Sequence, residues 1–155
     1  MTDRRLQRAG VVLAVLGLGV AGYLTYVHYA GITPVCNIAH GCAKVQSSQY
    51  AELAGVPVAL LGLIGYVGIL AALLVPGETA RMAAALMAVV GFGFSAYLTY
   101  RELFTIDAIC QWCVASAVLM TGLAIVTVWR VLLLPPAPQR TLTHLDGPVA
   151  SSDTG

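Results

Sequence analysis

Four long runs of apolar residues constrain this chain more than any other feature. They extend over about residues 9–30, 56–75, 82–101 and 109–129. Each is close to the roughly 20 residues that an α-helix needs to cross the hydrocarbon core of a bilayer. Charged residues make up only 10% of the 155 residues, against roughly 25% in a soluble domain. The sequence therefore predicts an all-α integral membrane protein, a bundle of four transmembrane helices.

The segments between the spans predict how the rest of the chain is organised. Residues 31–55 would form a long first loop, 76–81 ("PGETAR") a tight turn and 102–108 ("ELFTIDA") a short third loop. Residues 1–134 would then be one membrane domain. Residues 135–155 are rich in Pro, Ser, Thr and Gly, a composition typical of a disordered tail. The net charge of +1 gives no reason to expect a nucleic-acid partner.

The basic residues predict the orientation in the membrane. With four spans both termini share one side, and that side would carry six arginines: Arg4, Arg5, Arg8, Arg81, Arg130 and Arg140. The opposite side would carry only Lys44 and Arg101. Because basic residues accumulate on the cytoplasmic side, both termini are expected there, in the cell membrane. The first span is longer than a typical signal-peptide core and lacks a clear A-x-A site, so we expect it to be retained.

Four cysteines fall on the predicted extracytoplasmic side, in two pairs. Cys36 and Cys42 lie in the first loop, and Cys110 and Cys113 form the motif "CQWC" before the last span. This is the compartment in which disulfides form and persist. Positions i and i+3 of a helix lie about 5–6 Å apart, which suits a disulfide. A helix N-terminus also favours the thiolate that attacks disulfides. The spacing therefore indicates a redox-active dithiol.

Two other interpretations of these cysteines stay open at this point. Four cysteines could bind zinc, with His28 or His40 as further ligands, although the five residues between Cys36 and Cys42 exceed the usual zinc spacing of two to four. Two structural disulfides could also hold the outer loops together. A thioredoxin fold is excluded, because the C-x-x-C motif there requires a βαβ context that this chain lacks.

An internal repeat relates the two cysteine pairs. Residues 14–36 align without a gap with residues 88–110, and ten of the 23 positions are identical. The matches include the four-residue run "YLTY" and the pair formed by Cys36 and Cys110. A repeat of two spans keeps its orientation in the membrane. Both cysteine pairs are therefore expected at the same depth on the outer surface.

These features together resemble the vitamin K epoxide reductase family. The resemblance is carried by four spans, the pair Cys36/Cys42, Ser48 six residues on, and Cys110-x-x-Cys113. Residues 47–66, "SSQYAELAGVPVALLGLIGY", are similar to bacterial members in which a short loop helix leads through Gly-x-Pro into the second span. The similarity covers about residues 10–132. Many bacterial members carry a fused thioredoxin-like domain, whereas this sequence, which ends at Gly155, resembles a homologue without one.

The resemblance implies a quinone-dependent thiol oxidoreductase that supports disulfide formation. Cys36 and Cys42 would regenerate a separate thioredoxin-like (DsbA-like) protein outside the membrane and pass its electrons to Cys110 and Cys113. Cys110 would accept this exchange and Cys113 would face a membrane quinone. That quinone, menaquinone or ubiquinone, would be the electron-accepting substrate, and no metal is implied. The order of exchange within Cys36 and Cys42 stays open.

Further residues are candidates for the quinone site. The resemblance implies that Ser48 helps to line it. Trp112 would touch the quinone or anchor the chain at the membrane interface, and Tyr50 and Tyr66 are possible wall residues. Glu102, in the third loop, is interpreted as a surface charge, and Asp107 in the same way.

Two alternative functions accompany the leading one. In our alignment, animal enzymes have an asparagine at the position of Val58 and a tyrosine at that of Ala117, both in the pocket for the vitamin. The apolar residues here make plain quinone reduction a better expectation than epoxide reduction, which is the first alternative. The second is a non-enzymatic membrane protein with structural disulfides or a zinc site.

Overall fold

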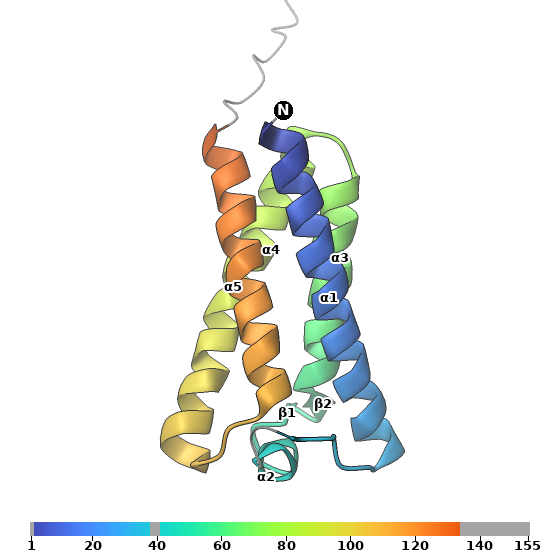
Figure 1. The fold of residues 1–155 in the computed structure, drawn as a ribbon, viewed down its shortest axis with the longest axis vertical. Helices are drawn as coiled ribbons and strands as arrows, with labels where there is room; N and C mark the ends of the chain where they lie inside the picture. The colour runs from blue at the N-terminus through green and yellow to red at the C-terminus, as the bar shows by residue number, and fades with distance from the viewer. Residues whose placement is uncertain (1, 38–40, 134–155) are drawn as a thin grey trace, which may run out of the picture.

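Four long helices run side by side along the molecule (Figure 1). The structure, a computed structural model, describes residues 2–37 and 41–133. The four helices are α1 (Thr2–Ala30), α3 (Val58–Leu74), α4 (Glu78–Arg101) and α5 (Gln111–Leu133). The shorter elements in the described residues are α2 (Cys42–Gln46), the π-helical turn η1 (Glu102–Ile106), and the strands β1 (Glu52–Leu53) and β2 (Val56–Pro57). The protein is therefore mostly helical.

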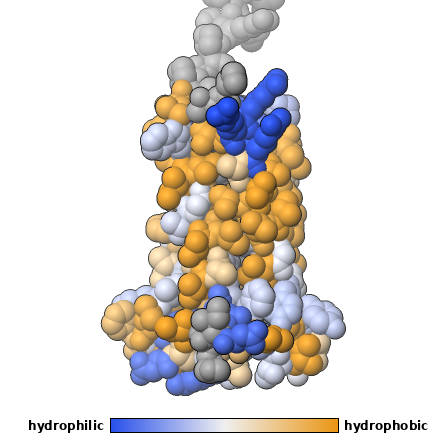
Figure 2. Space-filling view, viewed as in Figure 1, coloured by the Kyte–Doolittle hydropathy of each residue, from blue (hydrophilic) through white to orange (hydrophobic). Residues whose placement is uncertain are grey.

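Three of these helices are long and apolar enough to cross a membrane: α1, α4 with its continuation η1, and α5. The apolar helix α3 has 17 residues, about 26 Å at 1.5 Å per residue, which is the lower limit for a span. Figure 2 shows apolar residues covering the middle of one face, with hydrophilic residues toward its two ends. The molecule thus has three to four helices of membrane-spanning length, and the count of four spans stays a prediction.

The helix boundaries differ from the predicted ones at several ends. Helix α1 begins at Thr2 rather than near residue 9, because the polar segment before the apolar run contains good helix formers. Helix α4 begins at Glu78. The prediction of a turn over residues 76–81 is therefore wrong for most of its length, because residues 78–81 form the start of this helix. A glutamate there favours the positive end of the helix dipole. The predicted tail, 135–155, lies outside the described residues.

Small residues let the helices approach one another closely. Helices α1 and α4 each pack against both α3 and α5. The core between them contains Ala14, Ala21, Ala84 and Ala88, together with the fully buried ring of Tyr66. A β carbon at Gly17 would overlap that ring, so the glycine makes room for it. Glycine and alanine at such contacts are typical of helix packing in membranes, where close van der Waals contact holds helices together.

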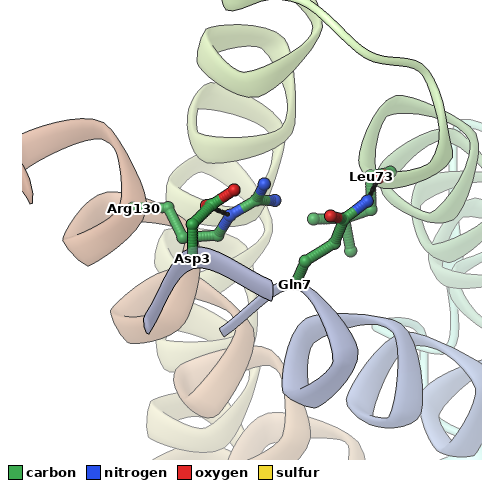
Figure 3. Close-up of polar contacts among 4 residues, drawn as sticks. All are labelled: Asp3, Gln7, Leu73 and Arg130. Carbon is green, nitrogen blue, oxygen red and sulfur yellow. Dashed lines mark hydrogen bonds and ion pairs between the residues drawn. The ribbon is translucent and has the colours of Figure 1, made fainter. Parts of the chain in front are cut away.

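Polar contacts join three of the long helices near the start of α1 and the end of α5 (Figure 3). The guanidinium of Arg130 in α5 donates to the carboxylate of Asp3 in α1 at 2.8 Å. The side-chain amide of Gln7 donates to the main-chain carbonyl of Leu73 in α3, also at 2.8 Å. The first loop and the short elements lie at the opposite end, where the long helices diverge (Figure 1).

The first loop is folded against this diverging end. Strands β1 and β2 pair antiparallel, with Leu53 opposite Val56. Their two-residue turn places Ala54 at φ 53° and Gly55 at φ 81°, positive values that a tight hairpin requires. The amide of Val58 donates to the carbonyl of Ala51 at 2.9 Å, which joins the hairpin to the start of α3. The short helix α2 precedes the hairpin and carries the second cysteine of the loop.

Candidate redox site

The four cysteines adopt two different states. Cys36 and Cys42 are joined by a disulfide, with their Cα atoms 6.3 Å apart, a usual separation. Cys110 and Cys113 are not bonded to each other. The amide of Val114 donates to the carbonyl of Cys110 at 3.0 Å, so Cys110 stands immediately before α5 and Cys113 in its first turn. The structure therefore has the motif at the start of a helix, as the sequence predicts.

The fold brings the two cysteine pairs into one apolar cluster. Cys42 and Cys110 are both fully buried in it, together with Val45 and Ile106. Cys36 and Cys113 are partly buried and pack against the same cluster. Residues more than 60 positions apart in the sequence thus meet between α2 and the segment before α5. This places the sulfurs where thiol–disulfide exchange requires little movement of the helices.

Gly41 allows the loop to approach the segment before Cys110. A β carbon at position 41 would lie 2.7 Å from both the main-chain nitrogen and the oxygen of Ile109, and 2.9 Å from the β carbon of Ala108. Any side chain other than hydrogen would therefore overlap with backbone atoms. This glycine, which stands directly before Cys42, is a packing requirement of the site that the sequence analysis did not single out.

Trp112 lies on the loop side of the motif. Its indole N–H donates to the main-chain carbonyl of Val35 at 2.9 Å, and its ring lies 4.8 Å from that of Tyr23. The hydroxyl of Tyr23 accepts a hydrogen bond from the amide of Val35 at 3.1 Å. Both main-chain groups of the residue before Cys36 are therefore held. A contact between Trp112 and a quinone stays a prediction.

An apolar cavity of about 380 Å³ lies among the four long helices and the first loop. Cys113 is on its wall, which gives one sulfur of the motif access to a bound molecule. Ser48, Tyr50 and Tyr66, all named from the sequence, are on the wall as well. The hydroxyl of Ser48 donates to the carbonyl of Val45 at 2.7 Å. A volume of this size is in the range of small-molecule sites.

Two residues of α3 shape the wall of this cavity in different ways. The hydroxyl of Tyr66 lies 3.0 Å from the carbonyl of Ser116 and 3.1 Å from its hydroxyl, which fixes the buried ring between α3 and α5. Val58, the residue that replaces the asparagine of animal enzymes in our alignment, is also on the wall. The wall is therefore apolar at that position.

The interpretation of Glu102 as a surface charge is wrong. Its side chain is only 5% exposed, and its carboxylate accepts a hydrogen bond from the amide of Cys110 at 3.2 Å. The cause is the π-helical turn η1, which widens the end of α4 before Asp107 leaves the helix at φ 48°. Turns of this kind occur often at functional sites. The sequence contained no signal for it, because a single glutamate in a short loop is usually solvated. Asp107 itself is exposed.

The thiol of Cys110 has an unusually low pKa. A hydrogen bond from the thiol of Cys113 stabilises the Cys110 thiolate and lowers its pKa from 9.0 to about 7, although burial of the sulfur acts in the opposite direction. Main-chain amides at the start of α5 contribute further. A thiolate at near-neutral pH is the species that carries out disulfide exchange.

The candidate zinc ligands that the structure describes are not grouped around a common point. Within residues 2–37 and 41–133, no group of three or more His, Cys, Asp or Glu side chains is placed to hold a metal ion. The sulfurs of Cys36 and Cys42 are bonded to each other, and His28 lies 3.5 Å from Glu52. His40, the other candidate ligand, is outside the described residues.

A comparison with known protein families gives the chain its place among them. Residues 9–128 match the model of the Vitamin K epoxide reductase family. This match includes the first loop, all four cysteines and most of each long helix. Membership of such a family implies oxidoreductase activity in general terms. Since the match covers most of the 155 residues, the chain belongs to the Vitamin K epoxide reductase family.

Proposed function

We propose that this protein is a membrane thiol oxidoreductase that passes electrons from an extracytoplasmic thioredoxin-like protein to a quinone. The main support for this proposal is that the two cysteines of the C-x-x-C motif lie in different environments. Cys110 is buried beside Cys42 of the loop, whereas Cys113 is on the wall of the apolar cavity. One sulfur thus faces the loop disulfide and the other faces a space for an apolar substrate.

The first step is the oxidation of the partner. A thiolate of the partner attacks the Cys36–Cys42 disulfide, and resolution of the mixed disulfide leaves the partner oxidised and both loop cysteines reduced. Cys36 is the more accessible member of the pair, since it is only partly buried whereas Cys42 is fully buried. We therefore assign the contact with the partner to Cys36. Two electrons have then entered the loop.

The second step transfers these electrons to the motif. The Cys42 thiolate attacks Cys110 of a Cys110–Cys113 disulfide, and Cys113 leaves as the thiolate. Cys36 then attacks Cys42 and releases Cys110. The products are a loop disulfide and a reduced motif, which is the combination of states in this structure. The low pKa of Cys110 favours its release.

The third step reduces the quinone. The dithiol of Cys110 and Cys113 supplies two electrons and two protons, so the quinone becomes a quinol and the motif becomes a disulfide. Menaquinone or ubiquinone would place its ring in the cavity beside Cys113, with Ser48 and Tyr50 on the same wall. Val58 offers no hydrogen bond there, which supports quinone reduction over the reduction of an epoxide.

The proposed location is the cell membrane, with the cysteine end facing outward. The starts of α1 and α4 and the end of α5 lie at the opposite end of the bundle (Figure 1). Those segments contain most of the basic residues: Arg4, Arg5, Arg8, Arg81 and Arg130. The positive-inside rule therefore supports cytoplasmic termini. A thioredoxin-like carrier would then meet the loop in the extracytoplasmic space.

The test uses purified protein that has been fully reduced and kept free of metal and oxygen. A soluble menaquinone analogue is added, quinol is measured by absorbance, and free thiols are counted with a mass-shifting alkylator. We expect the loss of two or four thiols with one quinol formed per two thiols. Cys113→Ser should abolish quinol formation, because no disulfide can form in the motif.

The loop variants provide the matched control. Cys36→Ser and Cys42→Ser should block oxidation of a protein partner but spare quinone reduction driven by a small dithiol that reaches the motif. Four persistent thiols and untouched quinone in the wild type would contradict the proposed function. That result would favour a structural or zinc-binding role for the cysteines.

A further inference from the structure

Glu102 is the one carboxylate that is buried among the described residues. Burying an ionised carboxylate is costly unless it is paired or hydrogen-bonded. Neither of the two salt bridges in the described part of the chain involves it. A carboxylate in such a position calls for an explanation other than stability.

The contacts of Glu102 are with the reacting groups themselves. Its Oε2 accepts a hydrogen bond from the amide of Cys110 at 3.2 Å. Cys113 is on the wall of the same cavity as Glu102. A carboxylate beside a thiol can take up the thiol proton. Glu102 is therefore hydrogen-bonded to the main chain of Cys110 and shares a cavity with Cys113.

Glu102 is also shared between two hollows of the molecule. It is on the wall of the apolar cavity that Cys113 faces. It is on the wall of a second, more open hollow as well, together with the polar residues Lys44 and Asp107. The first hollow suits an apolar substrate, and the second is lined by exposed charged side chains. Among the residues named so far, Glu102 alone faces both.

The geometry points to Glu102 as the proton carrier between the dithiol, the quinone and the outer aqueous surface. This inference rests on the proposed quinone reduction. When Cys110 and Cys113 form a disulfide they release two electrons and two protons, and the quinone takes up two of each. Glu102 takes the proton of the Cys113 thiol and transfers it to one quinone oxygen. The second proton, which Cys110 gives up to water when it ionises, enters from water through the second hollow and reaches the other quinone oxygen by way of the same carboxyl group.

The pH dependence of this step involves a limited set of neighbours. The titratable and charged groups around Glu102 are Cys110, Cys113, Lys44 and Asp107, together with Arg101, Tyr50 and Tyr66 on the wall of the first cavity. Glu102 acts as a base only when ionised. We therefore expect the quinone-reduction rate of the wild type to fall more steeply toward acidic pH than that of a variant without the carboxyl group, in which only the ionisation of Cys110 still limits the rate.

The test compares Glu102→Gln with Glu78→Gln. The glutamine at 102 keeps the size of the side chain and an acceptor for the Cys110 amide but cannot carry a proton. The control makes the same replacement at the other end of α4, at a residue on the wall of neither hollow. Pre-reduced protein is mixed with a menaquinone analogue in a stopped-flow instrument from pH 5 to 9. We expect a decrease of about 10²-fold for Glu102→Gln and less than about 2-fold for Glu78→Gln.

A second reaction distinguishes a loss of proton transfer from misfolding of the variant and from a failure of the proposed function. Oxidation of a thioredoxin-like dithiol by the Cys36–Cys42 disulfide needs the folded loop but no quinone. Glu102→Gln should keep that rate, and Glu102→Asp should recover part of the quinone rate. Equal losses in both reactions, or an unchanged quinone rate with the pH dependence of the wild type, would overturn the inference. Failure of the wild type to reduce quinone would instead reject the proposed function.

Discussion

Trp112 and Val35 are 77 residues apart in the sequence, yet the indole N–H of one donates to the main-chain carbonyl of the other at 2.9 Å. Because Trp112 lies between Cys110 and Cys113 and Val35 precedes Cys36, this bond joins the two cysteine pairs through their neighbours. Tyr23 holds the amide of Val35 on the other side. The loop disulfide is thereby positioned by contacts of the residue that precedes it in the chain.

We expect the replacement Trp112→Phe to loosen the first loop without unfolding the bundle. The phenyl ring can still pack against Tyr23, but the hydrogen bond to Val35 is lost, which costs about 0.5–1.5 kcal/mol. Amide hydrogen exchange of the peptide covering residues 31–37 should therefore become several-fold faster. Tyr23→Phe should have a similar effect on the amide of Val35 itself, since its hydroxyl is the acceptor.

Trp129→Phe is the matched control for this experiment. Its side chain is 55% exposed and lies near the far end of α5. Exchange in residues 31–37 should be the same as in the wild type. An unchanged exchange rate in Trp112→Phe and Tyr23→Phe together would show that these two bonds do not hold the loop.

Gly41→Ala should slow the exchange between the two cysteine pairs. The added methyl group would lie 2.7 Å from backbone atoms of Ile109, and overpacking of this kind typically costs about 1–3 kcal/mol. The loop must then move away from Cys110, so we expect the loop-to-motif transfer to slow by about 10-fold or more. Quinone reduction by a pre-reduced motif should be spared, because the cavity wall contains Cys113 and not Gly41.

The comparison for Gly41→Ala is Gly19→Ala. A β carbon at Gly19 has no heavy atom within 4 Å, and alanine is favoured over glycine in a helix. This variant should transfer electrons at the wild-type rate and be at least as stable. Equal rates in all three proteins would mean that close approach at position 41 is not needed for exchange.

The reduced motif should contain a thiolate near neutral pH. With a pKa of about 7, roughly half of Cys110 is ionised at pH 7, whereas a thiol with an ordinary pKa of 9.0 would be only about 1% ionised. The sign is fixed: the thiolate fraction rises as pH increases through 7. Thiolate absorbance near 240 nm in the Cys36→Ser/Cys42→Ser protein should show this midpoint.

The donor from Cys113 can be tested within the same titration. Cys113→Ala removes the hydrogen bond that stabilises the thiolate, so the midpoint should shift upward by more than one pH unit. Cys113→Ser retains a donor and should shift it less. If both variants kept a midpoint near 7, the main-chain amides at the start of α5 and not Cys113 would be its cause.

The ion pair at the other end of the bundle should matter for stability alone. Asp3→Asn leaves Arg130, whose side chain is 9% exposed, without its charged partner. Because the pair is only partly buried, we expect a loss of about 1–2 kcal/mol in the free energy of unfolding, measured by denaturation in detergent. The quinone rate per folded molecule should not change, since Asp3 lies at the end opposite to Cys113 (Figure 1).

Much of this architecture could be predicted because it depends on local properties of the sequence. The apolar runs correspond to the long helices, and α5 begins beside the motif as predicted. The repeat that pairs Cys36 with Cys110 correctly anticipated that the two pairs lie at the same end. Helix ends were less predictable, because polar helix formers extend α1 and α4 beyond their apolar cores.

The contacts that complete the site could not be predicted in the same way. The buried position of Glu102 follows from one π-helical turn, whose formation depends on how the end of α4 packs. The role of Gly41 depends on the backbone of Ile109, which is distant in the sequence. Neither has a composition or spacing signal, and only the assembled fold defines them.

The bundle is fastened at one end and spread at the other, and this asymmetry has a mechanical consequence. The bonds from Arg130 to Asp3 and from Gln7 to Leu73 tie three helices together far from the cysteines. The long helices diverge at the cysteine end (Figure 1), where the polar bonds described above run to the first loop and to the segment before α5 and not directly from one long helix to another. A long-tailed lipid could enter sideways between two helices there, while a water-soluble protein would meet the folded loop. In the proposed function, the quinone and the protein partner would then reach the site by different routes.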